Sequence, residues 1–265
     1  MTGFAARIPL LVIAHMLGIP DVDCERVLSW SADLARGFGA STPQDIEAAD
    51  RAQLGFNEYS AELIRAHRDV TRDDLLSALI AAERDGDRLS EQEVLDFVGG
   101  LLFAGHETTK NLIGNGLYLF AQHPDQWQVL RDDPALVPRA VEEVLRYEPP
   151  AGGAIRVVLE PTEVGGVSVK PGDTIFCATL AGNRDPDKFT DPQRFDVTRN
   201  EGGPLSFGSG LHFCLGAQLA RMETAAAFRG VLTRFPRLEL ATDQVHWKPG
   251  GLRGLKSLPM RFHRG

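Results

Sequence analysis

The chain has 265 residues, with 28 Lys and Arg against 36 Asp and Glu, which gives a formal net charge of −8. This acidic balance argues against a nucleic-acid-binding protein, because that function requires a basic surface. The three cysteines form no Cys-x-x-Cys pair, which excludes a disulfide scaffold and a Cys-rich zinc module. No apolar run reaches the roughly 18 residues of a membrane span. The composition therefore predicts a soluble protein of the cytoplasm, without membrane or nucleic-acid partners.

The first half of the chain has the start signals of helices. Thr42-Pro43-Gln44-Asp45 supplies an N-cap, a proline at the first helical position and an acid at the third. The Ala-rich stretch that follows predicts a helix to about Arg68. A shorter helix is expected to begin after Asp73 or Asp74.

A second capping box, Ser90-Glu91-Gln92-Glu93, precedes an apolar run, and no proline follows until Pro124. We therefore expect one helix from about residue 91 to 122, which spans about 45–50 Å. Its several glycines cost about 1 kcal/mol each in a helix interior. They indicate either close packing of another helix or, near Gly105, access of a flat ligand to the backbone.

The second half changes character after Pro149-Pro150, where a helix that follows Pro134 ends. Gly165-Gly166 predicts a β-hairpin, and a strand is expected over 174–178. Loops fill 182–210, a last helix runs from near Cys214 to about Arg234, and short strands follow. The pattern predicts one domain over residues 1–265, mainly α-helical with small β-sheets.

The ten residues from Phe207 to Gly216, Phe-Gly-Ser-Gly-Leu-His-Phe-Cys-Leu-Gly, are the most informative stretch. The glycines allow a tight loop, and Cys214 comes where the last helix is expected to begin. A helix N-terminus stabilises a thiolate, which makes Cys214 a nucleophile, a redox centre or a metal ligand. The alternative is an inert buried cysteine, the commoner fate of an isolated one.

This stretch resembles, at every position, the haem-ligand signature of the cytochromes P450, Phe-x-x-Gly-x-[His/Arg]-x-Cys-x-Gly. The resemblance implies haem b (iron protoporphyrin IX) as cofactor, with Cys214 as the axial thiolate and therefore the metal ligand. It places Phe207 against the haem, makes His212 a partner of a haem propionate, and assigns the glycines of the loop, Gly208 and Gly216, to the cofactor site. A surface loop histidine is the alternative for His212.

Ala104-Gly105-His106-Glu107-Thr108-Thr109 resembles the oxygen-activation sequence of the same family. The resemblance implies catalytic roles: Thr108 forms the hydrogen bond on the oxygen side, and Glu107 relays protons. A hydroxyl can donate and accept a hydrogen bond and so orient a water, while a carboxylate can shuttle protons. A distortion at Gly105 would leave room for O2. The alternative is an ordinary solvated helix face.

Two further matches concern arginines. Glu143-Val-Leu-Arg146 resembles the Glu-x-x-Arg helix of the family, whose i, i+3 spacing places both side chains on one face. The resemblance implies a structural triad completed by Arg194, from Pro192-Gln193-Arg194-Phe195. It also implies that Arg156 contacts a haem propionate, the alternative being an ordinary arginine at a strand edge.

The resemblance covers nearly the whole chain, which matches the C-terminal two-thirds of the family fold and lacks its N-terminal part. It implies a haem-thiolate monooxygenase that inserts one atom of the co-substrate O2 into a lipophilic small molecule. Electrons come from NAD(P)H through a ferredoxin- or flavodoxin-type partner. Candidate substrate walls are residues 98–103, 151–155 and 252–255, although plain core is an alternative. The alternative function is a catalytically incompetent remnant that binds haem weakly or not at all.

Overall fold

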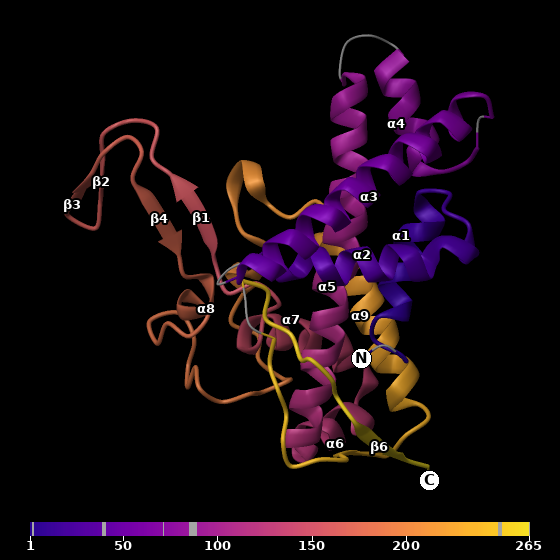
Figure 1. Ribbon diagram of the computed structural model, residues 1–265. Coiled ribbons are helices and arrows are strands. Elements are labelled where there is room, and N and C mark those ends of the chain that lie inside the picture. Colours follow the sequence, from indigo (N-terminus) through magenta and orange to yellow (C-terminus); the bar gives the residue numbers. More distant parts are fainter. Residues whose placement is uncertain (2, 39–40, 71, 85–88, 249–250, 265) are drawn as a thin grey trace.

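The computed structural model describes residues 1, 3–38, 41–70, 72–84, 89–248 and 251–264 (Figure 1). The α-helices are α1 (Arg7–Met16), α2 (Cys24–Arg36), α3 (Pro43–Arg68), α4 (Leu75–Arg84), α5 (Glu91–Gln122), α6 (Pro124–Asp132), α7 (Val137–Tyr147), α8 (Thr179–Gly182) and α9 (Ala217–Leu232). The strands are β1 (Ala154–Val157), β2 (Thr162–Val164), β3 (Val167–Val169), β4 (Thr174–Cys177), β5 (Arg237–Leu240) and β6 (Met260–His263). A mainly α-helical fold with small sheets is therefore confirmed.

Helix α5 is the central element, and the other helices lie around it (Figure 1). Its start is fixed by the predicted capping box, in which the Glu93 N–H donates to Ser90 Oγ at 3.2 Å. In return, the Ser90 N–H donates to the Glu93 carboxylate at 2.7 Å. These two bonds satisfy groups that a helix N-terminus leaves unpaired, so that the predicted range of 91–122 is confirmed.

Two separate hydrophobic cores lie along α5. The first half of α5, including Val98 and Leu102, packs with residues of α1 to α4. The second half, including Leu112 and Phe120, packs with α6, α7 and α9. Between the two cores α5 buries a run of polar side chains, namely His106, Glu107, Thr109, Lys110 and Asn111. Burying polar groups is costly unless they are paired, so this stretch of α5 needs partners from other elements.

Glycines on α5 mark places where other elements approach closely. A Cβ on Gly116 would lie 2.9 Å from Cε1 of Phe228 on α9. A Cβ on Gly105 would lie 3.3 Å from Ile13 on α1, and α5 is assigned as α-helix without a break through Gly105. The expectation of packing glycines is therefore confirmed for Gly116, and Gly105 also faces a neighbouring helix.

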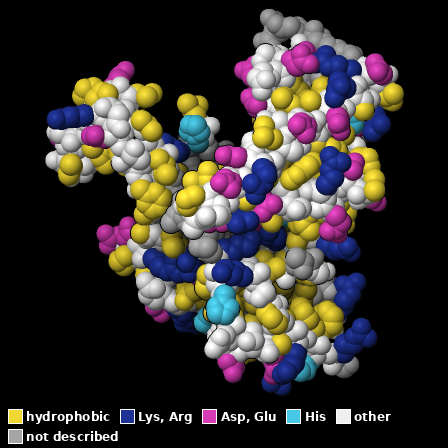
Figure 2. Space-filling model, viewed as in Figure 1, with side chains coloured by type: hydrophobic (Ala, Val, Ile, Leu, Met, Phe, Trp, Pro, Cys, Tyr) yellow, Lys and Arg dark blue, Asp and Glu magenta, His cyan; other side chains and the backbone are white. Residues whose placement is uncertain are grey.

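The middle of the chain forms a β arm, defined here as residues 154–177. Strands β1 and β4 pair antiparallel, from Ala154 opposite Cys177 to Val157 opposite Thr174. Strands β2 and β3 form the predicted hairpin, whose turn residues Gly165 and Gly166 have φ of 58° and 82°. The arm extends away from the helical body (Figure 1), and hydrophobic side chains gather over it (Figure 2). Strands β5 and β6 form a separate antiparallel pair.

Helix α9 begins at Ala217, so Cys214 precedes it by three residues. The expected start near Cys214 is therefore correct to within one turn, with Gly216 as the N-cap residue. Across the residues that the structure describes, no helix has the length and apolar character needed to cross a bilayer.

Replacing Gly116 by alanine is expected to destabilise the protein by about 1–3 kcal/mol, because the added methyl group overlaps the Phe228 ring. Gly100→Ala is the matched control on the same helix, since a Cβ at Gly100 meets no atom within 4 Å. It is expected to stabilise by up to about 1 kcal/mol through helix propensity alone. Urea unfolding of both variants measures the difference, and an equal effect of the two would contradict the packing assigned to Gly116.

Candidate functional site

The loop that carries Cys214 is closed by its own backbone. The Cys214 N–H donates to the Phe207 carbonyl at 2.9 Å, and the Phe213 N–H donates to the Gly210 carbonyl at 3.1 Å. Gly208 and Gly210 have φ of 71° and 65°, a region that other L-residues rarely adopt. The glycines in this loop are thus required by its geometry, as the sequence predicts.

A cavity of about 180 Å³, here called the cysteine cavity, lies between this loop and α5. It brings together Cys214 and Phe207 from the loop with Thr108 from α5, although Thr108 and Phe207 are more than 90 residues apart in the sequence. The resemblance implied that these residues meet. Its lining is Thr108, Thr109, Leu112, Leu145, Pro150, Ala151, Ser206, Phe207, Cys214 and Ala220. Most of these walls are apolar, so that a polar group inside has few protein partners.

Thr108 is the polar residue of α5 best placed for chemistry in the cysteine cavity. Its hydroxyl donates to the Ala104 carbonyl one turn earlier, at 2.7 Å. Because this bond uses its single proton, the oxygen remains free to accept a hydrogen bond from a water or another donor in the cavity.

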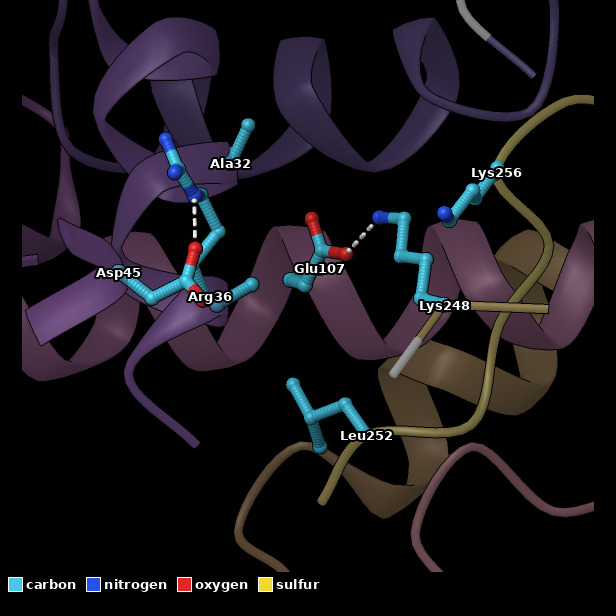
Figure 3. A pocket seen from close by; sticks show the side chains of 8 residues that line it. Ala32, Arg36, Asp45, Glu107, Lys248, Leu252 and Lys256 are labelled. Carbon is cyan, nitrogen blue, oxygen red and sulfur yellow. Dashed lines mark hydrogen bonds and ion pairs between the residues drawn. The ribbon is translucent and has the colours of Figure 1, made fainter. Parts of the chain in front are cut away.

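Glu107 lines a different cavity. This second cavity, of about 310 Å³ and here called the lysine cavity, lies between α2, the start of α3, α5 and the segment that joins β5 to β6 (Figure 3). The fully buried Glu107 carboxylate accepts a hydrogen bond from Lys248 Nζ at 2.7 Å and another from Lys110. The structure therefore does not bring Glu107 and Cys214 into one cavity, although Glu107 and Thr108 are neighbours in sequence.

Opposing effects set the pKa values of this ion cluster. Burial would raise the pKa of Glu107, but Lys110 and Lys248 outweigh it and hold the pKa below its usual value. Burial lowers the pKa of Lys110 to about 8, although Glu107 opposes that shift. Burial also lowers the pKa of His106 to about 4, with Lys110 adding to the effect, so its ring is neutral at pH 7.

The expected arginine triad is present with one correction. Arg146 binds Glu143 through two hydrogen bonds of 2.7 and 2.8 Å, both side chains being buried. The third guanidinium belongs to Arg199, whose Nε lies 3.2 Å from Glu143, and not to Arg194. Arg194 contributes its backbone carbonyl, which accepts a hydrogen bond from Arg146 at 3.0 Å, while its side chain is 63% exposed. Carbonyl acceptors carry no sequence signal, which explains the misassignment.

The other predicted cofactor residues are not among the residues that line the cysteine cavity. His212 is exposed in a short 3-10 turn of the cysteine loop, Gly210–His212. Arg156 is exposed on β1, and its guanidinium donates to the adjacent Ile155 carbonyl at 2.9 Å. Gly216 caps α9. These roles stay predictions.

The expected substrate walls divide into two groups. Val98 and Leu102 belong to the core, whereas Ala151 lines the cysteine cavity and Leu252 lines the lysine cavity. Ala151 and Leu252 also form an antiparallel β-bridge with each other, so one wall residue of each cavity lies side by side there.

The residues at the cysteine cavity fit a haem. Cys214 is an exposed free cysteine, and the described residues contain no group of three or more His, Cys, Asp and Glu side chains able to hold a metal. A single thiolate suits a metal whose other ligands come from a macrocycle. A Cβ at Gly210 or Gly216 would meet nothing within 4 Å, which leaves room beside the loop for a flat group. Exposed apolar side chains flank this space, among them Leu211, Phe213 and Leu215.

Several residues of these cavities were not expected from the sequence. Lys110 follows Glu107 by three positions, a spacing that places the two on one helix face and could have indicated the pair. Lys248 is 141 residues away from Glu107, and no local pattern links them. Thr109 and Ser206 also line the cysteine cavity, and each stands in or next to a stretch that the sequence had singled out without giving either residue a role.

Comparison with models of protein families matches residues 41–256 to the family described as "Cytochrome P450". Among curated proteins, the chain is 45% identical over 262 residues to cytochrome P450 107B1 of Saccharopolyspora erythraea. That alignment covers 97% of this chain and 63% of the relative. The chain is also 40% identical over 270 residues to the cytochrome P450 monooxygenase PikC of Streptomyces venezuelae. That alignment covers 100% of this chain and 64% of the relative.

Among solved structures, the LnmA cytochrome P450 hydroxylase of the leinamycin biosynthetic pathway of Streptomyces atroolivaceus superposes with a TM-score of 0.87 at 43% identity. The match covers 97% of this chain and 67% of that one. The chain thus spans just under two thirds of the length of the curated relatives.

Arg146→Met is expected to destabilise the protein by about 3–5 kcal/mol, because it leaves the buried Glu143 with less compensation and frees three backbone carbonyls. Arg194→Met, which keeps the same carbonyl, is expected to stay within about 0.5 kcal/mol of the parent. Denaturant unfolding measures both free energies, and a large loss for Arg194→Met would restore Arg194 to the triad.

Proposed function

Because the chain belongs to the cytochrome P450 family, we propose that residues 1–265 form one haem-thiolate domain of a monooxygenase. The reaction inserts one oxygen atom from O2 into a lipophilic small molecule. The observation that carries this proposal is the cysteine cavity, in which the thiol of Cys214 and the hydroxyl of Thr108 line one largely apolar space.

In this proposal Cys214 binds the iron of haem b, and Phe207 packs beside it. The bound cofactor supplies the O2 chemistry, since a thiolate ligand pushes electron density to the iron and favours O–O cleavage. His212 and Arg156 reach the propionates, which requires the Arg156 guanidinium to leave the Ile155 carbonyl. Gly208 and Gly216 keep the loop close to the flat cofactor, whereas Gly105, which the resemblance also assigned to this site, faces Ile13 of α1.

The proton path in this proposal uses the two neighbouring residues of α5 for different steps. Thr108 holds a water through its free lone pairs in the cysteine cavity. Lys248 has a side chain that is 27% exposed, so it can take up protons from solvent, and Glu107 relays them from Lys248 toward Thr108. For the relay to reach Thr108, the carboxylate has to turn away from the lysines.

The substrate is proposed to be lipophilic because the walls of the cysteine cavity are mostly apolar. Electrons are proposed to come from NAD(P)H through a ferredoxin- or flavodoxin-type protein. The cytoplasm is the proposed location, since Cys24, Cys177 and Cys214 are all free cysteines, as is usual in a reducing compartment.

Cys214→Ser is expected to abolish the far-red-shifted Soret band of thiolate ligation, recorded on hemin-supplemented, reduced protein under carbon monoxide. Cys177→Ser is the control, because Cys177 is exposed on β4 and does not line the cysteine cavity. It is expected to keep the band. A parent protein that stays colourless with hemin, or that shows an unshifted band, would exclude the proposed function.

Thr108→Val replaces the hydroxyl by a methyl group of similar size, while Thr108→Ser keeps the hydroxyl. The valine variant is expected to lose about tenfold or more in product formed per NADH consumed, because no group then holds the water. The serine variant is expected to retain most of this ratio. Both are measured with a reconstituted redox chain, and equal coupling in the two variants would remove the role assigned to the Thr108 hydroxyl.

A further inference from the structure

The lysine cavity has apolar walls and charged ends (Figure 3). Ala32 and Ala35 of α2 and Leu252 of the segment between β5 and β6 supply the apolar part. Its charged groups come from α2, α3, α5 and the same late segment. A ligand that fills this space therefore contacts both hydrocarbon and charge.

At one end of the lysine cavity the carboxylates outnumber the single cation. The Nε of Arg36 on α2 donates to Asp45 of α3 at 2.9 Å, and another guanidinium nitrogen donates to Asp33 at 3.3 Å. Two carboxylates thus face one guanidinium, so this end carries a net negative charge and disfavours a further anion.

The other end carries excess positive charge. Lys110 and Lys248 share one carboxylate, that of Glu107, and of the lysines Lys248 and Lys256 line the cavity. Within the described part of the chain, no hydrogen bond or ion pair engages Lys256 Nζ. The neutral ring of His106 contributes no charge. Two lysines therefore line this end of the cavity, next to one carboxylate that already binds Lys110.

We propose that the lysine cavity binds the carboxylate of an amphiphilic small molecule, with Lys256 and Lys248 as its anchors. An ammonium group has three donors, so Lys248 can hold Glu107 and a ligand carboxylate at the same time. A ligand carboxylate suits the ammonium groups of Lys248 and Lys256, because hydrogen bonds between charged groups are stronger than those between neutral groups.

The position of the lysine cavity relative to the cysteine cavity links the proposed carboxylate site to the choice of substrate. Glu107 and Thr108 are consecutive on α5 and open to the lysine and cysteine cavities respectively, and the Ala151–Leu252 bridge links the opposite walls. For the apolar body of an acid held at Lys256 to reach the cysteine cavity, it has to extend past the Ala151–Leu252 bridge. This inference rests on the proposed function and specifies its substrate class as a lipophilic carboxylic acid rather than a neutral lipophilic molecule.

The test compares decanoate with decan-1-ol, which share the chain length and differ in charge. Isothermal titration calorimetry on the full hemin-supplemented chain is expected to show about tenfold tighter binding of decanoate. The preference is expected to shrink as salt is raised, because Lys256 is exposed. Equal affinities, or no binding of either probe, would overturn the proposal.

Lys256→Met is expected to reduce the preference for decanoate several-fold, and Lys256→Arg is expected to preserve it. Lys170→Met, on the β arm, removes an exposed lysine outside the cavity and is expected to leave the preference unchanged. A full preference in Lys256→Met would contradict the anchor. The thiolate spectrum is recorded on the same samples, so that its loss with the preference intact counts against the proposed function alone.

Discussion

The Glu107 carboxylate is buried in the middle of α5 and holds two lysines that reach it from different parts of the chain. An ionised carboxylate taken out of water costs several kcal/mol unless opposite charges compensate it. Lys110 supplies one charge from the next turn of α5, and Lys248 supplies the other from the segment between β5 and β6. This pairing requires the late segment to lie against α5, where Asn115 also donates to the Arg253 carbonyl at 3.2 Å.

The same stretch of α5 separates the two hydrophobic cores and borders both cavities. Consecutive residues of an α-helix point about 100° apart, so that Glu107 and Thr108 open to different spaces. One wall is thereby charged and the other largely apolar, with no additional element between them. Within the buried polar run, Glu107 is compensated by Lys110 and Lys248, whereas the Asn111 side chain has no hydrogen-bond partner among the described residues.

Local signals in the sequence were sufficient for α3, α5, the β2–β3 hairpin and the loop around Cys214, but α2 and α6 were not predicted. The Ser90 capping box determines where α5 begins, and Gly208 and Gly210 adopt the positive φ that only glycine favours. Long-range pairings were not predictable in the same way. Arg199 replaces the expected Arg194 because the choice depends on how the chain folds back over Glu143. Lys248 meets Glu107 across 141 residues for the same reason.

The β arm carries Arg156 on strands whose side chains are mostly exposed, away from both cores. With little buried apolar area, such a unit opens at a lower free energy than α5, and its amides are expected to exchange with solvent sooner. A partner that binds the Arg156 guanidinium would bind the folded β arm more tightly than the locally unfolded one. Binding of a partner to the Arg156 guanidinium is therefore thermodynamically linked to the protection of the arm amides from exchange with solvent. A measurement of either one reports on the other.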